Sequence, residues 1–110
     1  MLVGREMLLS LMMLGMWDEA NRFLRHQLLP AARRWLGSDA DFTLKLKRNL
    51  ADTLCLSPEH SRDDLLEAET IMQDVVQRRR VVQDPTHPDT LSAEEGLSLV
   101  RANLAARAHA

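Results

Sequence analysis

A sequence pattern that returns after about 47 residues limits what this chain can fold into more than any other feature. Thr43-Leu44 reappears as Thr90-Leu91, 47 residues later, and Glu19-Ala20 reappears as Glu67-Ala68, 48 residues later. Self-similarity at a period of ~20–50 residues is typical of proteins built from stacked structural units. The 110-residue chain is therefore predicted to be one domain of two units, at about 1–36 and 37–83, followed by a half unit at 84–110.

Apolar residues within each unit recur at three- and four-residue steps, which is the spacing of an amphipathic helix. We predict an all-α fold of about five helices, at residues ~3–14, ~17–35, ~41–56 and ~62–82 and from Pro88 onward. The apolar stripe predicted for the second helix includes Ala31 and Trp35. The stripe predicted for the last helix consists of Leu91, Leu97, Val100, Leu104 and Ala108.

Local signals mark the ends of these helices. Gly15 is expected to end the first helix because glycine tolerates the left-handed conformation of a tight helix exit. Ser61 and Asp64 have the spacing of a capping box. Pro30 conflicts with its helix, since it clashes with the carbonyl of His26 at a cost of ~3 kcal/mol, so we expect a kink between these two residues.

Composition and charge argue against several classes of partner. The net charge of −2 gives no global attraction to nucleic acid or to an anionic membrane. The apolar run 7–16 is too short to span a bilayer, which needs ~20 residues, and is expected to be a buried helix of the first unit. Cys55 is the only cysteine; it excludes an intrachain disulfide and favours a reducing, cytoplasmic location.

Residues with catalytic or metal-binding chemistry are scattered along the chain. Cys55 has no evident histidine and third group to activate it, and no glycine-rich phosphate loop occurs. No pair of histidines has a metal-binding spacing; the four are His26, His60, His87 and His109. We therefore expect a protein that is not an enzyme and that has no metal or cofactor.

The two stretches that separate the units carry a family resemblance. Leu36-Gly37 with Thr43-Leu44, and His87–Leu91 in the second stretch, resemble the Leu-Gly-x-x-His-Pro-x-Thr-Leu spacer of tetratricopeptide repeats of the kinesin light chain type. Asn49-Leu50-Ala51 is similar to a motif in the first helix of that repeat, and Gly15–Ala20 to its turn. Gly96 departs from the pattern, because it stands where the repeat would place the equivalent of Asn49.

The resemblance implies a right-handed superhelical stack of antiparallel helix pairs, an α-solenoid. Such arrays bind partners on a concave surface, which in this family is lined by the first helix of each pair. Asn49 is the best match to a groove residue, because its amide can both donate to and accept from a peptide backbone; a solvated surface amide is the alternative. The groove positions that the resemblance implies are Arg5, Glu6, Leu9, Met12, Lys45, Arg48, Asn49, Asp52, Ser92, Glu95 and Leu99.

These observations predict a protein–protein interaction module that holds a peptide or a partner segment, with no nucleic acid and no membrane as partners. Lys45 and Arg48 favour an acidic residue near the middle of the groove. The alternative is a structural fragment of a longer repeat protein that binds nothing by itself. The last helix has a neighbour on its inner side only, so we expect exposed apolar residues there and self-association through Leu97, Val100 or Leu104.

Overall fold

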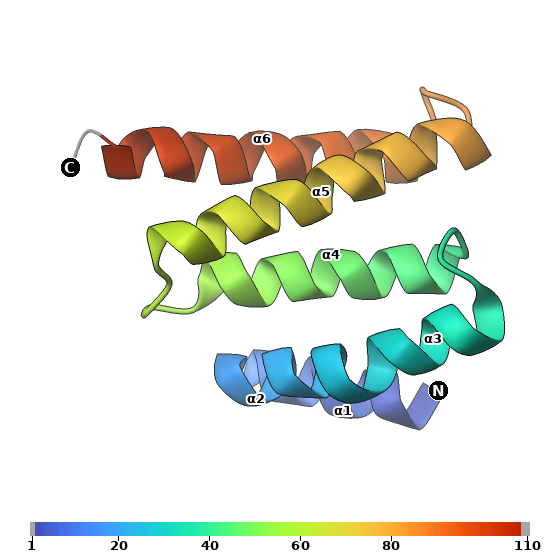
Figure 1. Cartoon of the computed structure of the whole chain (residues 1–110), viewed down its shortest axis with the longest axis horizontal. Coiled ribbons are helices and arrows are strands. Elements are labelled where there is room, and N and C mark those ends of the chain that lie inside the picture. Colours follow the sequence, from blue (N-terminus) through green and yellow to red (C-terminus); the bar gives the residue numbers. More distant parts are fainter. Residues whose placement is uncertain (1, 109–110) are drawn as a thin grey trace.

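The computed structural model describes residues 2–108, with side chains from residue 4 to residue 107, and the described backbone is helical throughout apart from short connectors (Figure 1). No strand occurs in this range, so the all-α prediction is confirmed. Three of the segments join end to end, which leaves five rods. The segments are α1 Leu2–Met13, α2 Trp17–Phe23, the π-helical turn η1 Leu24–Leu28, α3 Leu29–Leu36, α4 Asp41–Leu56, α5 Arg62–Val82 and α6 Pro88–Ala108.

Successive rods run antiparallel and each packs on the next (Figure 1). The helix α4 lies at the centre, with α2, η1 and α3 on one side and α5 on the other, and α6 packs on α5. The molecule measures 42 × 32 × 19 Å. Its smallest dimension is about two helix diameters of ~10 Å each, so the fold is a slab no more than two helices thick.

The two halves of the slab have separate apolar cores that meet at α4. One core lies between α4, α5 and α6 and consists of Ala51, Leu54, Ala68, Met72, Val75, Val76, Ala93, Leu97 and Val100. The other lies between α1, the rod α2–η1–α3 and α4, and consists of Leu8, Ala20, Leu24, Leu28, Leu29, Ala32, Leu46 and Leu50. Ile71 of α5 packs against both, so the cores are continuous at one point.

The predicted helix ends are confirmed where side-chain or glycine chemistry specifies them. Gly15 has φ +73° and Gly37 has φ +93°, both in the left-handed region that favours glycine. Ser61 accepts a hydrogen bond from the Asp64 amide at 3.1 Å, and the Asp64 carboxylate accepts one from the Ser61 amide at 2.9 Å. This is the predicted capping box, and α5 begins at the next residue, Arg62.

The conflict at Pro30 is resolved by a π-helical turn. The amide of Leu29 donates to the carbonyl of Leu24, five residues back. The rod stays continuous through Pro30, as predicted, and the irregularity falls one turn earlier than the proline. A π turn inserts one extra residue into a helix, and the wider turn relieves the clash that Pro30 would otherwise make with the preceding carbonyls.

Because of this extra residue, part of the apolar stripe predicted for the second helix is wrong. Ala31 and Trp35 were expected to face the core, but Ala31 is half-buried and Trp35 is 76% exposed. Leu29 and Ala32 are buried in their place. One inserted residue rotates all later positions by about 100° around the axis, so the residues of α3 that face α4 are shifted along the sequence.

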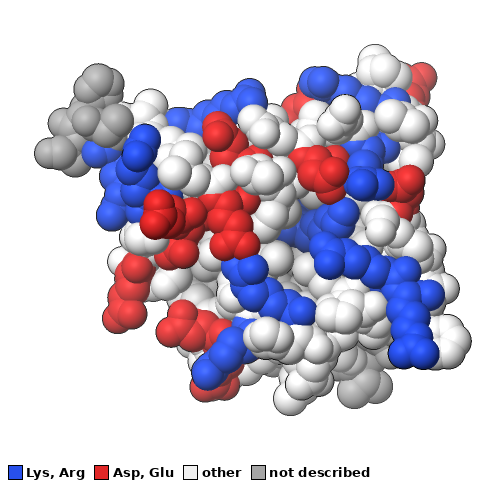
Figure 2. Space-filling model, viewed as in Figure 1, with Lys and Arg blue, Asp and Glu red and all other residues white. Residues whose placement is uncertain are grey.

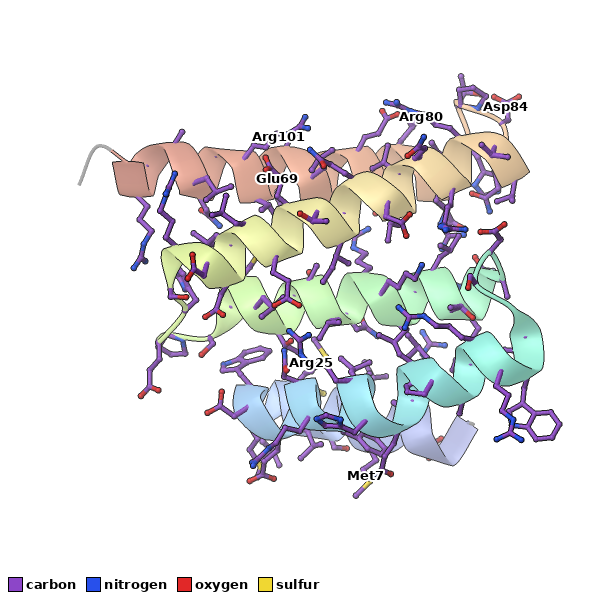
Figure 3. All side chains as sticks on the ribbon, in the orientation of Figure 1. Met7, Arg25, Glu69, Arg80, Asp84 and Arg101 are labelled. Carbon is purple, nitrogen blue, oxygen red and sulfur yellow. The ribbon has the colours of Figure 1, made fainter. Side chains whose placement is uncertain are left out.

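The expectation that the run 7–16 is buried is also wrong. The run forms α1, but only Leu8 is fully buried, and Met7 and Met13 are mainly exposed; Figure 3 shows Met7 pointing away from the slab. The reason is that α1 is covered on one side only, by α2 and by Leu28, whose Cδ2 lies 2.7 Å from where a side chain on Gly4 would begin. A search of the described helices for a membrane-spanning stretch found no candidate.

The last helix buries the residues that were expected to be exposed. Leu97 and Val100 lie in the core against α5, and Leu104 is half-buried beside them. Leu91, predicted on the inner stripe, is exposed, as is Leu99. The side chain of Ala108 lies outside the described residues. The inner face of α6 is therefore largely covered by α5, and Leu97 and Val100 have almost no exposed surface through which the protein could self-associate.

Ala68 provides a direct stability test of the α4–α5–α6 core. Its side chain is completely buried, so Ala68→Leu should overpack the contact and lower the free energy of unfolding by ~1–3 kcal/mol. Thermal unfolding followed by circular dichroism measures this as a lower Tm. The same substitution at the exposed Ala105 of α6 is the control; equal melting temperatures for both variants would contradict the packing described here.

Candidate functional site

One side of α4 remains uncovered by its neighbours and carries four of the predicted groove residues. Lys45 is exposed, and Arg48, Asn49 and Asp52 are half-buried. Their spacing of three, four and seven residues places them on one face of the helix. The opposite positions, such as Leu46 and Leu50, are buried in the core, so this face is set by the same amphipathic pattern that makes α4 central.

A hollow of about 90 Å³ lies beside this face, between α4 and α6. Its apolar lining comes from Leu44, Val75 and Ala93, one residue from each of α4, α5 and α6. Its polar lining consists of Lys45, Arg48, Arg79, Asp89 and Ser92. Three predicted groove residues, Lys45, Arg48 and Ser92, are thus brought together from two helices 40 or more residues apart in the sequence.

Arg48 links the two helices across the hollow. Its Nη1 donates a hydrogen bond to the Ser92 hydroxyl at 2.5 Å. A side chain on Gly96 would begin 3.5 Å from Nη2 of Arg48 and 3.0 Å from Cε of Met72. The departure of Gly96 from the repeat pattern therefore has a physical role, because the missing side chain leaves room for the buried Met72, while the Arg48 guanidinium lies at ordinary contact distance.

The hollow contains more positive than negative charge. Arg79 is only 4% exposed, and its Nη1 donates to Oδ1 of Asp41 at 2.6 Å. Lys45 pairs with the other oxygen of Asp41 at 3.0 Å. The hydrogen bond from Arg79 lowers the pKa of Asp41, burial opposes this, and Lys45 adds to the lowering. Arg48 forms no ion pair with any described residue, so its charge faces the hollow with only a neutral hydroxyl as partner.

Asp52 lies one turn further along the same face. Burial raises the pKa of the Asp52 carboxyl, and the positive charge of Arg48 opposes that rise. The carboxylate is thus held in a partly desolvated position where a ligand group that donates hydrogen bonds would stabilise it. Asn49, between Arg48 and Asp52 on this face, forms no side-chain hydrogen bond with the described residues, which leaves its amide open to a ligand.

A second set of ion pairs fixes α4 to α5 on the other side of the helix. Lys47 is only 7% exposed and donates to Oδ2 of Asp74 at 2.9 Å. Arg78 donates to both oxygens of Asp74 and also pairs with Asp39 before α4. Burial alone would raise the pKa of Asp74, but the hydrogen bonds from Lys47 and Arg78 outweigh it and the pKa is lowered. The Lys47–Asp74 pair was not predicted, because it joins two helices at residues 27 positions apart in the sequence.

The remaining predicted groove residues are more dispersed. Arg5, Glu6 and Leu9 are exposed on α1, and Glu95 and Leu99 are exposed on α6. Met12 is half-buried against the core around Leu8 and Leu24. The structure therefore gathers the α4 and α6 positions Lys45, Arg48 and Ser92 at one hollow, whereas Met12 contributes to packing.

Two polar residues of the hollow, Arg79 and Asp89, were missed as site residues. Arg79 lies in the triplet Arg78-Arg79-Arg80, but its spacing from Met72 and Val75 places it on the same buried face of α5, and that spacing was the signal for its burial. Asp89 follows Pro88 in the first turn of α6, where an acidic residue is favourable for the helix dipole. Nothing in its sequence context distinguishes a site residue from a capping one.

The described part of the chain offers few side chains that could bind a metal ion or act as a nucleophile. No group of three or more histidine, cysteine, aspartate or glutamate side chains there is arranged to hold a metal ion. The Cys55 thiol is half-buried, and burial together with the nearby charge of Asp52 raises its pKa to about 11. At neutral pH it is a protonated, poorly nucleophilic group.

No family model matches the chain, and neither a curated protein nor a solved structure matches it significantly.

The ion pairs of Asp41 and Asp74 predict a stability loss in acid. Both folded-state pKa values lie below that of an unfolded aspartate, ~3.9, so the unfolded state binds protons first as the pH falls. Urea unfolding should show stability that is fully present above about pH 5 and decreases progressively below it. Asp74→Asn should lower stability at pH 7, because Lys47 loses its partner, and should reduce the loss in acid.

Asp18→Asn is the control for this experiment, because Asp18 is exposed and forms no ion pair with a described residue. Its stability should follow the wild-type pH dependence. A pH dependence for Asp74→Asn that is identical to that of the wild type would show that the Lys47–Asp74 pair does not contribute to acid unfolding.

The thiol of Cys55 should react slowly in the folded protein. A pKa of about 11 rather than 9.0 lowers the thiolate population at pH 8 by roughly 100-fold. Alkylation by iodoacetamide, followed by mass spectrometry, should therefore be far slower in buffer than in urea. Equal rates in the two conditions would mean that Cys55 is accessible and unperturbed.

Proposed function

We propose that this protein is an interaction module that holds a peptide or an extended partner segment along the face formed by α1, α4 and α6. The observation that carries the proposal is the convergence of Lys45, Arg48 and Ser92 on one hollow, with Asn49 and Asp52 beside them on α4. These groups bind and orient polar atoms; the Ser92 hydroxyl accepts a hydrogen bond from Arg48 and is not hydrogen-bonded to any base among the described residues that would activate it as a nucleophile.

The chemistry of the face indicates what a ligand would offer. The amide of Asn49 can pair with both a donor and an acceptor of an extended peptide backbone. Lys45 and Arg48 favour a carboxylate, and a hollow of about 90 Å³ has room for the end of one acidic side chain. The Asp52 carboxylate favours a hydrogen-bond donor of the ligand next to it. The ligand is thus a peptide with an acidic residue near its middle and no strong overall charge.

The architecture we propose for this face is a right-handed array of tetratricopeptide type. The repeated spacer, the glycine turn at Gly15 and the antiparallel pairs α1 with α2–η1–α3 and α4 with α5 support it, with α6 as the first helix of a third unit. In such an array the first helices line the concave side. We propose protein as the partner class, with neither nucleic acid nor membrane, and a cytoplasmic location.

The affinity should be modest. Exposed charge pairs contribute only ~0.2–1 kcal/mol each, and each net hydrogen bond ~0.5–1.5 kcal/mol. Two and a half units make a short groove, so dissociation constants should be on the order of micromolar or weaker. Backbone pairing through Asn49 should matter about as much as the charges of Lys45 and Arg48.

A peptide-array screen followed by titration calorimetry tests the proposal. The best acidic peptide should bind wild type, while Asn49→Ala should weaken binding by roughly tenfold and Lys45→Glu/Arg48→Glu should abolish it. The control is Arg33→Glu/Arg34→Glu, which makes the same change of charge at the far end of α3 and should bind like the wild type.

Two outcomes would contradict the proposal. Equal binding by the wild type and by both groove variants would place the site elsewhere on the molecule. The absence of any binder in the array would favour the alternative, a structural segment that binds nothing by itself.

A further inference from the structure

Charge is distributed unevenly over the slab, although both signs occur at each end. Figure 2 shows basic side chains running along the lower right of the molecule without acidic neighbours, whereas acidic side chains gather toward the left. The right-hand end carries the last turn of α3, and the left-hand end carries the start of α2 and the connector between α4 and α5 (Figure 1). These ends face opposite directions along the longest dimension of the molecule, 42 Å.

The right-hand end carries a pattern that occurs twice, two arginines followed by two apolar residues at the end of a helix. Arg33-Arg34-Trp35-Leu36 ends α3, and Arg79-Arg80-Val81-Val82 ends α5, 46 residues later. The apolar residues of both copies are exposed, up to 76% for Trp35 and 80% for Val81. The two copies are otherwise used differently.

In the α5 copy both arginines are engaged within the molecule. Arg79 pairs with Asp41, and Arg80 pairs with Glu94 of α6 at 2.8 Å; Figure 3 shows Arg80 near the end of α5. In the α3 copy, Arg33 and Arg34 form no ion pair with any residue the structure describes. We call Arg33, Arg34 and Trp35 the basic end, since it offers, beside an exposed indole, two cations without an ion-pair partner among the described residues. The guanidinium carbon of Arg34 lies 6.0 Å from the centre of the Trp35 ring.

The acidic end contains a hollow of about 280 Å³. It is lined by Gly15, Trp17, Asp18, Ser57, Pro58 and Glu59. Among the described residues, Asp18 and Glu59 have no cationic partner. An indole ring next to two carboxylates is a favourable setting for a guanidinium, which can stack on the ring and bind carboxylate oxygens.

Exposed apolar residues directly precede or follow the lining residues in the sequence. Leu14 and Met16 precede α2, and Leu56 ends α4; all three are exposed. They offer a contact surface for an aromatic ring that arrives with a cation. We call Trp17, Asp18 and Glu59, with these three apolar residues, the acidic end.

We propose that the basic end of one copy docks into the acidic end of a second copy of this chain, with Arg34 in the hollow and Trp35 against the three apolar residues of the acidic end. A second copy satisfies both surfaces at once. An acidic peptide or an anionic membrane would cover the basic end and leave Asp18 and Glu59 unpaired. The two ends lie on different parts of the molecule, so the contact is head-to-tail and lets each copy bind two neighbours.

This contact also replaces the expectation that the last helix mediates self-association. Leu97 and Val100 of α6 are buried, whereas Trp35 and Leu14 are exposed. The two ends have charges of opposite sign and can therefore pair with each other. The exposed Leu99 of α6 carries no charge and offers no such complementarity.

Analytical ultracentrifugation across a concentration series tests the proposal. The average mass of the wild type should rise above the 12.5 kDa monomer with concentration and should fall again in 0.5 M NaCl, since salt screens exposed charges. Arg33→Gln/Arg34→Gln and Asp18→Asn/Glu59→Gln should each weaken association by roughly tenfold or more. Circular dichroism should show that both variants keep the wild-type helix content.

Mixing these two variants gives the decisive measurement. Each retains one intact end, so an equimolar mixture should form a 1:1 dimer and no larger species, at concentrations where either variant alone is a monomer. A wild type that stays monomeric throughout, or a mixture that stays monomeric, would overturn the proposal. So would loss of association in Leu99→Lys with normal association in both end variants.

The groove variant Lys45→Glu/Arg48→Glu separates this proposal from the proposed function. It should associate like the wild type while failing to bind peptide. Conversely, Arg33→Gln/Arg34→Gln should bind peptide normally while failing to associate. Loss of both properties in either variant would contradict the independence of the two surfaces.

Discussion

The packing of α4 against two apolar cores is the constraint on which the rest of the structure depends. Leu46 and Leu50 pack into the core shared with α1 and the rod α2–η1–α3, and Ala51 and Leu54 pack into the core shared with α5 and α6. The solvent-accessible polar residues of α4 lie mainly on one narrow face, whereas the buried Lys47 is paired with Asp74 of α5. The candidate groove lies on that face because the two cores leave no other part of the helix available.

Buried charges add specificity to this apolar arrangement. Lys47 and Arg79 are almost fully covered and each has a carboxylate partner, Asp74 and Asp41 respectively. Such pairs contribute little net stability compared with apolar residues of the same size, but breaking one is costly because a charge is left buried without a partner. A slip of α4 along α5 by one turn would break both pairs, so we infer that they define the register of these two helices.

The sequence predicted the helices well and the details of their faces less well. The bounds of α4 and α5, the capping box at Ser61 and the glycine exit at Gly15 follow from local chemistry, which acts over a few residues. The exposure of Trp35 could not be predicted in this way, because it depends on the π turn earlier in the helix. The close packing at Gly96 could not be predicted either, because it depends on neighbouring helices. Lys45, Arg48 and Ser92 were chosen through family resemblance, and periodicity alone would not have paired α4 with α6.

The extra residue of the π turn determines which way the end of α3 faces. In a regular helix the phase of α3 would differ by about 100°, Trp35 would turn toward α4, and the neighbouring arginines would turn with it. The side chains at the end of α3 are thus oriented by backbone geometry two turns earlier. A natural variant that lacks one residue between Leu24 and Leu28 would have a regular helix in place of the π turn. The side chains at the end of α3 would then face another direction, although none of these residues had changed.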